Sequence, residues 1–195
     1  ERFDPDTLRY YLGINMPENG DADFNWPDFV EKINSELIAA YGNFVHRVLT
    51  LGARLPNSGD GPFLEFDNLE QTLSIQQKLE DLHSSITESL SRHRFKEALR
   101  FAMNAAQVGN QFLQSSTPWK YLAEHDDDSS ATYSTERMQA LSALSFGWRT
   151  ARYLAIVMQP FLPFSSAKLW ESLGQSGDVS PVSYTHLRAH ETRIH

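Results

Sequence analysis

The sequence predicts an all-α protein, an antiparallel helix bundle, on the strength of three observations. Apolar residues recur at helical spacing over long stretches, while the alternating pattern of a half-buried strand is nearly absent. The chain has 195 residues, 41% of them hydrophobic, which suits one domain with a substantial core. Short stretches rich in Gly, Pro, Asn and Asp separate the periodic segments, as expected for helices joined by turns.

The first two helices carry clear start signals. The segment 4–6 (DPD) supplies a cap, a first-turn proline and an acid that suits the helix dipole, so we expect a helix from there to about Met16. After a turn-rich loop, Asn25 can cap a second helix that has Pro27 in its first turn. This helix is expected to run to about Arg54, where the sequence LPNSGDGPF ends it.

Apolar spacing and proline positions predict the later helices. A third helix has an apolar stripe from Ile75 to Leu90, and a fourth has one from Phe95 to Leu113. The stretch QPFLPF contains two prolines and is expected to be extended. The later helices are therefore expected at 69–90, from 91 or 93 to about 113, in a short piece opened by the Thr-Pro-Trp of 117–119, at 135–158, and at 165–173 with Gly174 as its stop.

Composition and charge exclude several classes of protein. No apolar run approaches the roughly 18 residues of a membrane span, and the start lacks the pattern of a signal peptide. The absence of Cys excludes disulfides and thiolate metal sites and fits a reducing compartment. A net charge of −8 argues against general binding to DNA or RNA but leaves room for a local site. The basic run RHRFKEALR at 92–100 is most simply a solvated helix face.

The last segment, 178–195, does not follow the helical pattern. It contains three of the seven His residues, and His186 and His190 lie one helical turn apart, a spacing that metals can use. His195 is one place too late for the zinc-protease motif. We expect this segment to be a non-native tail that holds no metal.

The long second helix places two hydrogen-bonding side chains one turn apart. On a wheel at about 100° per residue, Asn43 and Arg47 fall opposite the apolar side, with Ala40 near them and Thr50 and Arg54 continuing the line. Such an amide and guanidinium offer several donors and one acceptor, which can bind the edge of a base. A solvated surface explains the same spacing. The apolar side of the wheel holds Leu37, Ile38, Tyr41, Phe44, Val45 and Val48.

A tryptophan later in the chain is a second candidate. Trp119 stands at a corner between a loop and a short helix, beside Lys120. It is either a core residue, as Trp148 is expected to be, or a partly exposed ring on which an unpaired base can stack. Unpaired loop bases are where RNA sequence is usually recognised.

Five stretches of the sequence follow one another in a distinctive order. They are FDPDTLRYYL (3–12), DADFNWPDFVEKINSEL (21–37), YGNFVHRVL (41–49), NQFLQSSTPWK (110–120) and PFLPFSSAKLWESLG (160–174). Together they resemble the anticodon-binding helical domain of the methionyl-tRNA synthetases, over about residues 1–174. The combination of N-x-x-x-R with a later P-W is the most specific part of this resemblance, and DADFNW is similar to the archaeal and eukaryotic-like branch.

The resemblance implies roles for individual residues. In that family the Asn and Arg of N-x-x-x-R contact the first anticodon base, a cytosine, and the Trp of P-W stacks on it. Carried over, this makes Asn43, Arg47 and Trp119 the residues that bind the CAU anticodon loop of tRNA(Met), with Arg54 and Lys120 as possible contacts to the RNA backbone. One departure is the QSS before Thr117, where the family often has an acidic residue.

The resemblance also implies what the chain lacks. The H-I-G-H and K-M-S-K-S signatures are absent, so we expect no catalytic residue in this chain. The parent enzyme would join methionine to tRNA in the cytoplasm with ATP and Mg²⁺, and zinc is possible in the missing N-terminal catalytic domain. Residues 1–20 would then be the end of the linker from that domain and the first helix, 21–177 the anticodon-binding bundle, and 178–195 the tail.

Three other interpretations stay open. The domain can belong to a leucine, isoleucine, valine or cysteine enzyme of the same class, although N-x-x-x-R with P-W argues against this. It can be a helical scaffold that binds protein through an apolar groove lined by Phe146, Trp148 and Phe164. Metal-dependent chemistry at His125 and 126–128 is the weakest, because three consecutive Asp side chains point in different directions.

Overall fold

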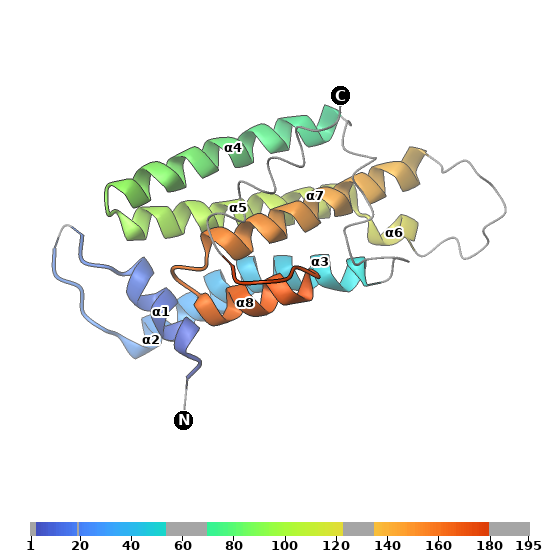
Figure 1. The fold of residues 1–195 in the computed structure, drawn as a ribbon. Coiled ribbons are helices and arrows are strands. Elements are labelled where there is room, and N and C mark those ends of the chain that lie inside the picture. Colours follow the sequence, from blue (N-terminus) through green and yellow to red (C-terminus); the bar gives the residue numbers. More distant parts are fainter. Residues whose placement is uncertain (1–2, 19, 54–69, 123–134, 180–195) are drawn as a thin grey trace.

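The computed structural model describes residues 3–18, 20–53, 70–122 and 135–179, and every regular element in these ranges is a helix (Figure 1). This confirms the all-α bundle. The elements are α1 (Pro5–Ile14), α2 (Trp26–Lys32), η1 (Ile33–Gly42), α3 (Asn43–Gly52), α4 (Glu70–Ser91), α5 (Phe95–Ser116), α6 (Trp119–Leu122), α7 (Thr135–Val157) and α8 (Pro163–Ser172).

The start signals act as expected. Asp4 caps α1, its Oδ1 accepting the backbone N–H of Asp6 at 2.8 Å, and Pro5 occupies the first turn, where no N–H is needed. Asn25 caps α2 in the same way, with its Oδ1 3.2 Å from the backbone nitrogen of Asp28. Each cap satisfies one of the free N–H groups at a helix start.

The second predicted helix is continuous from Trp26 to Gly52 but changes its hydrogen bonding midway. Its central ten residues, η1, form a π-helix, and the N–H of Asn43 is directed at the carbonyls of Ile38 and Ala40. A π-turn holds more residues than an α-turn. The wheel drawn at 100° per residue is therefore wrong here: Ile38 is 55% exposed, and Ala40 faces the core at 8%.

The middle of the bundle is α5, which contacts α1, η1, α3, α4 and α7. Helices α4, α5 and α7 alternate in direction, whereas η1 and α3 run alongside α5 in the same direction (Figure 1). The approach of α5 to α3 depends on Gly109, because a Cβ there would lie 2.5 Å from the ring of Phe44. The apolar stripe expected on α5 is confirmed, with Leu99 and Leu113 fully buried.

Two connections differ from simple helix ends. Helix α5 ends at Ser116 and is capped by Thr117, whose φ of 41° lies in the left-handed region, and α6 starts two residues after Thr117. The extended conformation predicted for QPFLPF is wrong, because 158–161 form a turn in which Leu162 N–H donates to the Met158 carbonyl at 2.7 Å. Its second proline, Pro163, opens α8, because a first-turn proline loses no helical hydrogen bond.

Several expectations concern parts of the chain outside the described residues: Arg54, the acidic loop with His125 and 126–128, and the tail from residue 180. Of the three aromatic residues considered for a groove, Phe146 and Trp148 are buried and Phe164 is 57% exposed. No helix within the described ranges is long and apolar enough to cross a membrane.

Candidate functional site

Asn43 and Arg47 line the same hollow, of about 350 Å³, between η1–α3 and α5. The sequence-based pairing of these two side chains is therefore matched by a shared concave surface. Asn43 is exposed and Arg47 is half-buried, so both reach solvent. The other residues that line the hollow are Ala39, Ala40, Gln107, Asn110, Gln111 and Gln114.

The π-segment shapes the floor of this hollow. It brings Ala40 to the inner side, and the side-chain Nδ2 of Asn110 donates to the Ala40 carbonyl at 2.7 Å. This bond ties α5 to η1 through two residues that line the hollow. The Oδ1 of Asn110 is buried, and within the described chain it has no hydrogen-bond partner.

Arg47 dominates the electrostatics of the hollow. Among the residues described as lining it, Arg47 is the single charged one. Its guanidinium has no ion pair or hydrogen bond to the described parts of the chain. Five N–H donors are thus free to bind a ligand, in a setting that otherwise consists of neutral amides.

The chemistry of the hollow suits binding. Its lining holds amides and a guanidinium, and no imidazole, carboxylate, thiol or hydroxyl among the described residues, so it has no group that transfers protons near neutral pH. Within the described ranges, no three His, Asp or Glu side chains are placed to hold a metal ion.

Among the described residues, three groups with shifted pKa values lie in α1, α2 and η1. Burial, and then the hydrogen bond to Glu36, raise the pKa of Tyr10 far above its ordinary value. Burial also raises the pKa of Tyr41, whose ring packs in the core. The hydrogen bond from Tyr11, followed by that from Lys32, lowers the pKa of Asp28.

Trp119 is not among the residues that line this hollow. It is half-buried at the start of α6, after the left-handed Thr117 and the buried Pro118, and Lys120 beside it is exposed. Helix α6 packs on α7, at the end of the bundle where α5 ends (Figure 1). The structure therefore places Asn43 and Arg47 on one hollow, while Trp119 lies outside its lining, five residues beyond Gln114 along the chain.

The sequence analysis assigned no binding role to the four amide residues that α5 contributes to the hollow, and it noted Gln114 only as a departure from the family. These residues are Gln107, Asn110, Gln111 and Gln114. Their spacing of three and four residues places them on one face of α5. That regular amide spacing was the available signal. It does not show by itself which neighbouring helix the face meets.

The comparisons with known proteins agree with this architecture. Residues 73–191 match the family model for the anticodon-binding domain of tRNA ligase, and residues 1–49 match that for tRNA synthetases class I (M). The methionine–tRNA ligase of Roseiflexus castenholzii is 37% identical over 185 residues, covering 93% of this chain and 28% of the relative. That of Methanopyrus kandleri is 36% identical over 182 residues, covering 93% and 25%.

Solved structures support the fold. A Mycobacterium tuberculosis methionyl-tRNA synthetase in complex with methionyl-adenylate superposes with a TM-score of 0.74 at 19% identity, covering 94% of this chain and 33% of that one. The apo form of the enzyme from the same organism gives a TM-score of 0.72 at 20% identity, covering 88% and 33%. The chain thus spans about a quarter of the curated relatives and a third of these structures.

Proposed function

The chain belongs to the family of anticodon-binding domains of tRNA ligases, and from this premise we propose that it recognises the CAU anticodon loop of tRNA(Met). The observation that carries the proposal is the hollow shared by Asn43 and Arg47. Its free guanidinium and its amides provide the donors and acceptors that an unpaired base requires.

The first anticodon base, cytosine, is the proposed occupant of this hollow. Cytosine presents acceptors at O2 and N3 and a donor at its exocyclic amine. Arg47 supplies donors to the acceptors, and the Asn43 amide supplies either polarity. Uracil reverses the polarity at two of these positions, which leaves groups unpaired at about 1–3 kcal/mol each. That cost corresponds to roughly 5- to 150-fold in affinity.

Trp119 is proposed to stack on the same base or on its neighbour in the loop. Its ring is half-buried, which leaves part of it for contact with a base. Stacking on an aromatic side chain contributes about 1–3 kcal/mol per base. Lys120, exposed beside it, and Arg54 are proposed to contact the RNA backbone.

We further propose that the parent protein is a cytoplasmic methionine–tRNA ligase, whose ATP and Mg²⁺, and any zinc, are bound outside this chain. Exposed apolar side chains near the start of the chain are our support for a neighbouring domain. They are Phe3, Leu8, Leu12, Phe24, Trp26 and Val30, each at least 42% exposed.

The test is binding of fluorescent anticodon stem-loops that differ only in the first anticodon base. We expect the chain to bind the cytosine loop more tightly than the uracil loop. Arg47→Ala and Asn43→Ala should weaken binding to the cytosine loop and reduce the difference, and Trp119→Ala should weaken binding to both loops. Lys168→Gln, on the exposed side of α8, is a control that should change neither. Equal affinity of the unmodified chain for both loops would refute base recognition.

A further inference from the structure

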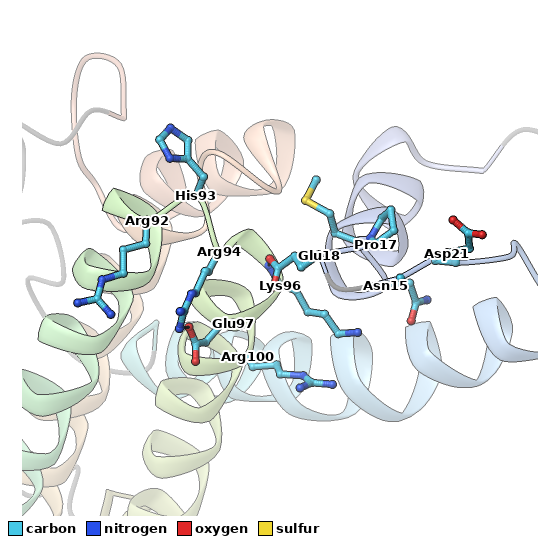
Figure 2. A pocket seen from close by; sticks show the side chains of 13 residues that line it. Asn15, Pro17, Glu18, Asp21, Arg92, His93, Arg94, Lys96, Glu97 and Arg100 are labelled. Carbon is cyan, nitrogen blue, oxygen red and sulfur yellow. Dashed lines mark hydrogen bonds and ion pairs between the residues drawn. The ribbon is translucent and has the colours of Figure 1, made fainter.

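Three hollows follow one another along α5. The first, of about 760 Å³, lies at the start of α5 and includes Lys96 and Arg100 (Figure 2). The second, of about 310 Å³, shares both of these residues with the first and Gln107 with the third. The third is the hollow of Asn43 and Arg47. Because neighbouring hollows share residues, the three adjoin one another along the helix, and we call this row of hollows the groove.

The groove has a length that suits an extended ligand. At 1.5 Å per residue, Arg100 and Gln114 lie about 21 Å apart along the axis of α5. At the ~3.4 Å per base step of B-form DNA this distance spans about six steps, and an A-form RNA stem, whose rise is smaller, spans it with at least as many. A mononucleotide would occupy one hollow only. A stem-loop whose loop base lies at Arg47 has phosphate groups that reach the far end.

The charge of the groove contrasts with that of the whole chain. The chain has 17 Lys and Arg against 25 Asp and Glu. The three hollows instead have more basic than acidic residues. The basic ones are Lys32, Arg47, Arg92, Arg94, Lys96 and Arg100. The acidic ones are Glu18, Asp21, Glu36 and Glu97.

Most of these acidic groups already have partners. Glu18 accepts the backbone N–H of Lys96 at 2.8 Å, and Glu36 accepts the hydroxyl of Tyr10 at 2.6 Å. Glu97 is paired with Arg94 at 3.5 Å. These bonds direct the carboxylates toward the protein's own donors.

Two further cations in the described part of the groove, besides Arg47, are free. The side chains of Lys96 and Arg100 have no ion pair or hydrogen bond within the described residues. Figure 2 shows them extending in the same direction from α5, toward the side of Asn15. Tyr10, the aromatic residue that lines the middle hollow, is fully buried, so this part of the groove offers cations and amides but no ring for stacking. Two free cations without an accessible ring beside them suit phosphate groups, and phosphate contacts carry no sequence information.

We propose that Lys96 and Arg100 form a phosphate site for the stem of the RNA whose loop lies at Asn43 and Arg47. The proposal rests on the function proposed above. It assigns the two ends of the groove different tasks: the end at Arg47 distinguishes bases, and the end at Arg100 binds the sugar–phosphate backbone of any sequence. Phosphate contacts also fix the register of the RNA, which places the loop base.

The test compares two double variants with the same change in charge. Lys96→Gln with Arg100→Gln removes the proposed site. Lys78→Gln with Lys168→Gln removes two exposed lysines that line none of the three hollows. Affinity for the cytosine and uracil stem-loops is measured between 50 and 200 mM salt, and circular dichroism verifies that both variants remain helical.

We expect the groove variant to bind both loops more weakly by the same factor, roughly fivefold or more at 0.1 M salt, with an unchanged preference for cytosine. The slope of log K against log salt is negative, and it should become less steep by about 1.4 to 1.8, that is 0.7 to 0.9 for each lost contact. A stem-loop with a shortened stem should no longer distinguish the groove variant from the unmodified chain, because the phosphates that reach Arg100 are then missing.

The proposal is overturned if the groove variant behaves as the control variant does, or if it loses the preference for cytosine while its salt slope stays unchanged. If the unmodified chain binds both loops equally, base recognition is refuted but the phosphate site is not. The salt slopes of the groove and control variants still show whether Lys96 and Arg100 bind phosphate. If the unmodified chain binds neither loop, both proposals fail.

Discussion

The contact between Gly109 and Phe44 permits a quantitative test of how the site is held together. Gly109→Ala introduces a Cβ with ring atoms of Phe44 at 2.5, 2.8 and 3.1 Å, where carbon atoms normally lie about 3.5–4.0 Å apart. Phe44 is fully buried and cannot turn toward solvent. Helix α5 and helix α3 must therefore separate by about 1 Å.

Two opposing effects determine how much Gly109→Ala changes the free energy of unfolding. Overpacking of a core costs about 1–3 kcal/mol, and three close ring contacts place this substitution in the upper part of that range. The greater helix propensity of Ala over Gly returns about 0.8–1.0 kcal/mol. We expect a net loss of about 1–2 kcal/mol in the free energy of unfolding. With a urea m-value of about 2 kcal/mol/M, the midpoint should fall by roughly 0.5–1 M.

Gly42→Ala is the matched control on the facing helix. A Cβ at Gly42 would meet only the Leu37 carbonyl, at 3.5 Å, so the helix-propensity gain should raise the midpoint. Phe44→Leu combined with Gly109→Ala should destabilise less than the sum of the single changes, because the smaller side chain makes room. The reasoning is refuted if urea unfolding, followed by circular dichroism, shows Gly109→Ala to be as stable as the unmodified chain.

Three other predictions concern single residues. Thr117→Gly should be more stable than Thr117→Ala by about 1 kcal/mol in urea unfolding, because Gly relieves the left-handed strain at φ 41° whereas Ala keeps a Cβ; equal stabilities would contradict this strain. Tyr41→Phe should raise stability, since it removes a buried hydroxyl with no described partner. Because the pKa of Tyr41 is raised in the folded state, ionisation of this hydroxyl leaves folding stability unchanged below pH 10 and lowers it as the pH rises above 10. Tyr41→Phe should therefore also resist unfolding by alkali better. An unchanged midpoint of alkaline unfolding would contradict this expectation. The lowered pKa of Asp28 contributes folding stability that is present above its ordinary pKa, near 4, and is lost as the pH falls below it. The stability of Asp28→Asn should therefore depend less on pH in acid than that of the unmodified chain. Identical midpoints of acid unfolding would argue against the Tyr11 and Lys32 bonds.

Local chemistry explains which elements the sequence predicts well. The caps at Asp4 and Asn25 and the apolar stripes on α4 and α5 depend on neighbours within a few residues, and all are present in the structure. The short helix at Trp119 is predicted from its Thr-Pro start for the same reason. The pairing of Asn43 with Arg47 also follows from spacing, because two side chains four residues apart share a face in an α-helix.

The errors come from assumptions about geometry. The wheel uses a constant α-helical step, so within the π-segment it places Ile38 on the buried side and Ala40 on the exposed side, the reverse of the structure. No local sequence pattern predicts the hydrogen bonds of this π-segment. The extended QPFLPF is inferred from its prolines alone, yet proline is equally compatible with a turn followed by the first residue of a helix.

By itself, the sequence determined the helices, their ends and their apolar faces, since these follow from hydrogen bonding and burial within short segments. Only the tertiary structure decided that the amide face of α5 lies opposite Asn43 and Arg47, and that Lys96 and Arg100 continue the same groove. Which polar faces meet depends on how whole helices pack, and Gly109 and the π-segment set that packing at a distance from the residues they bring together.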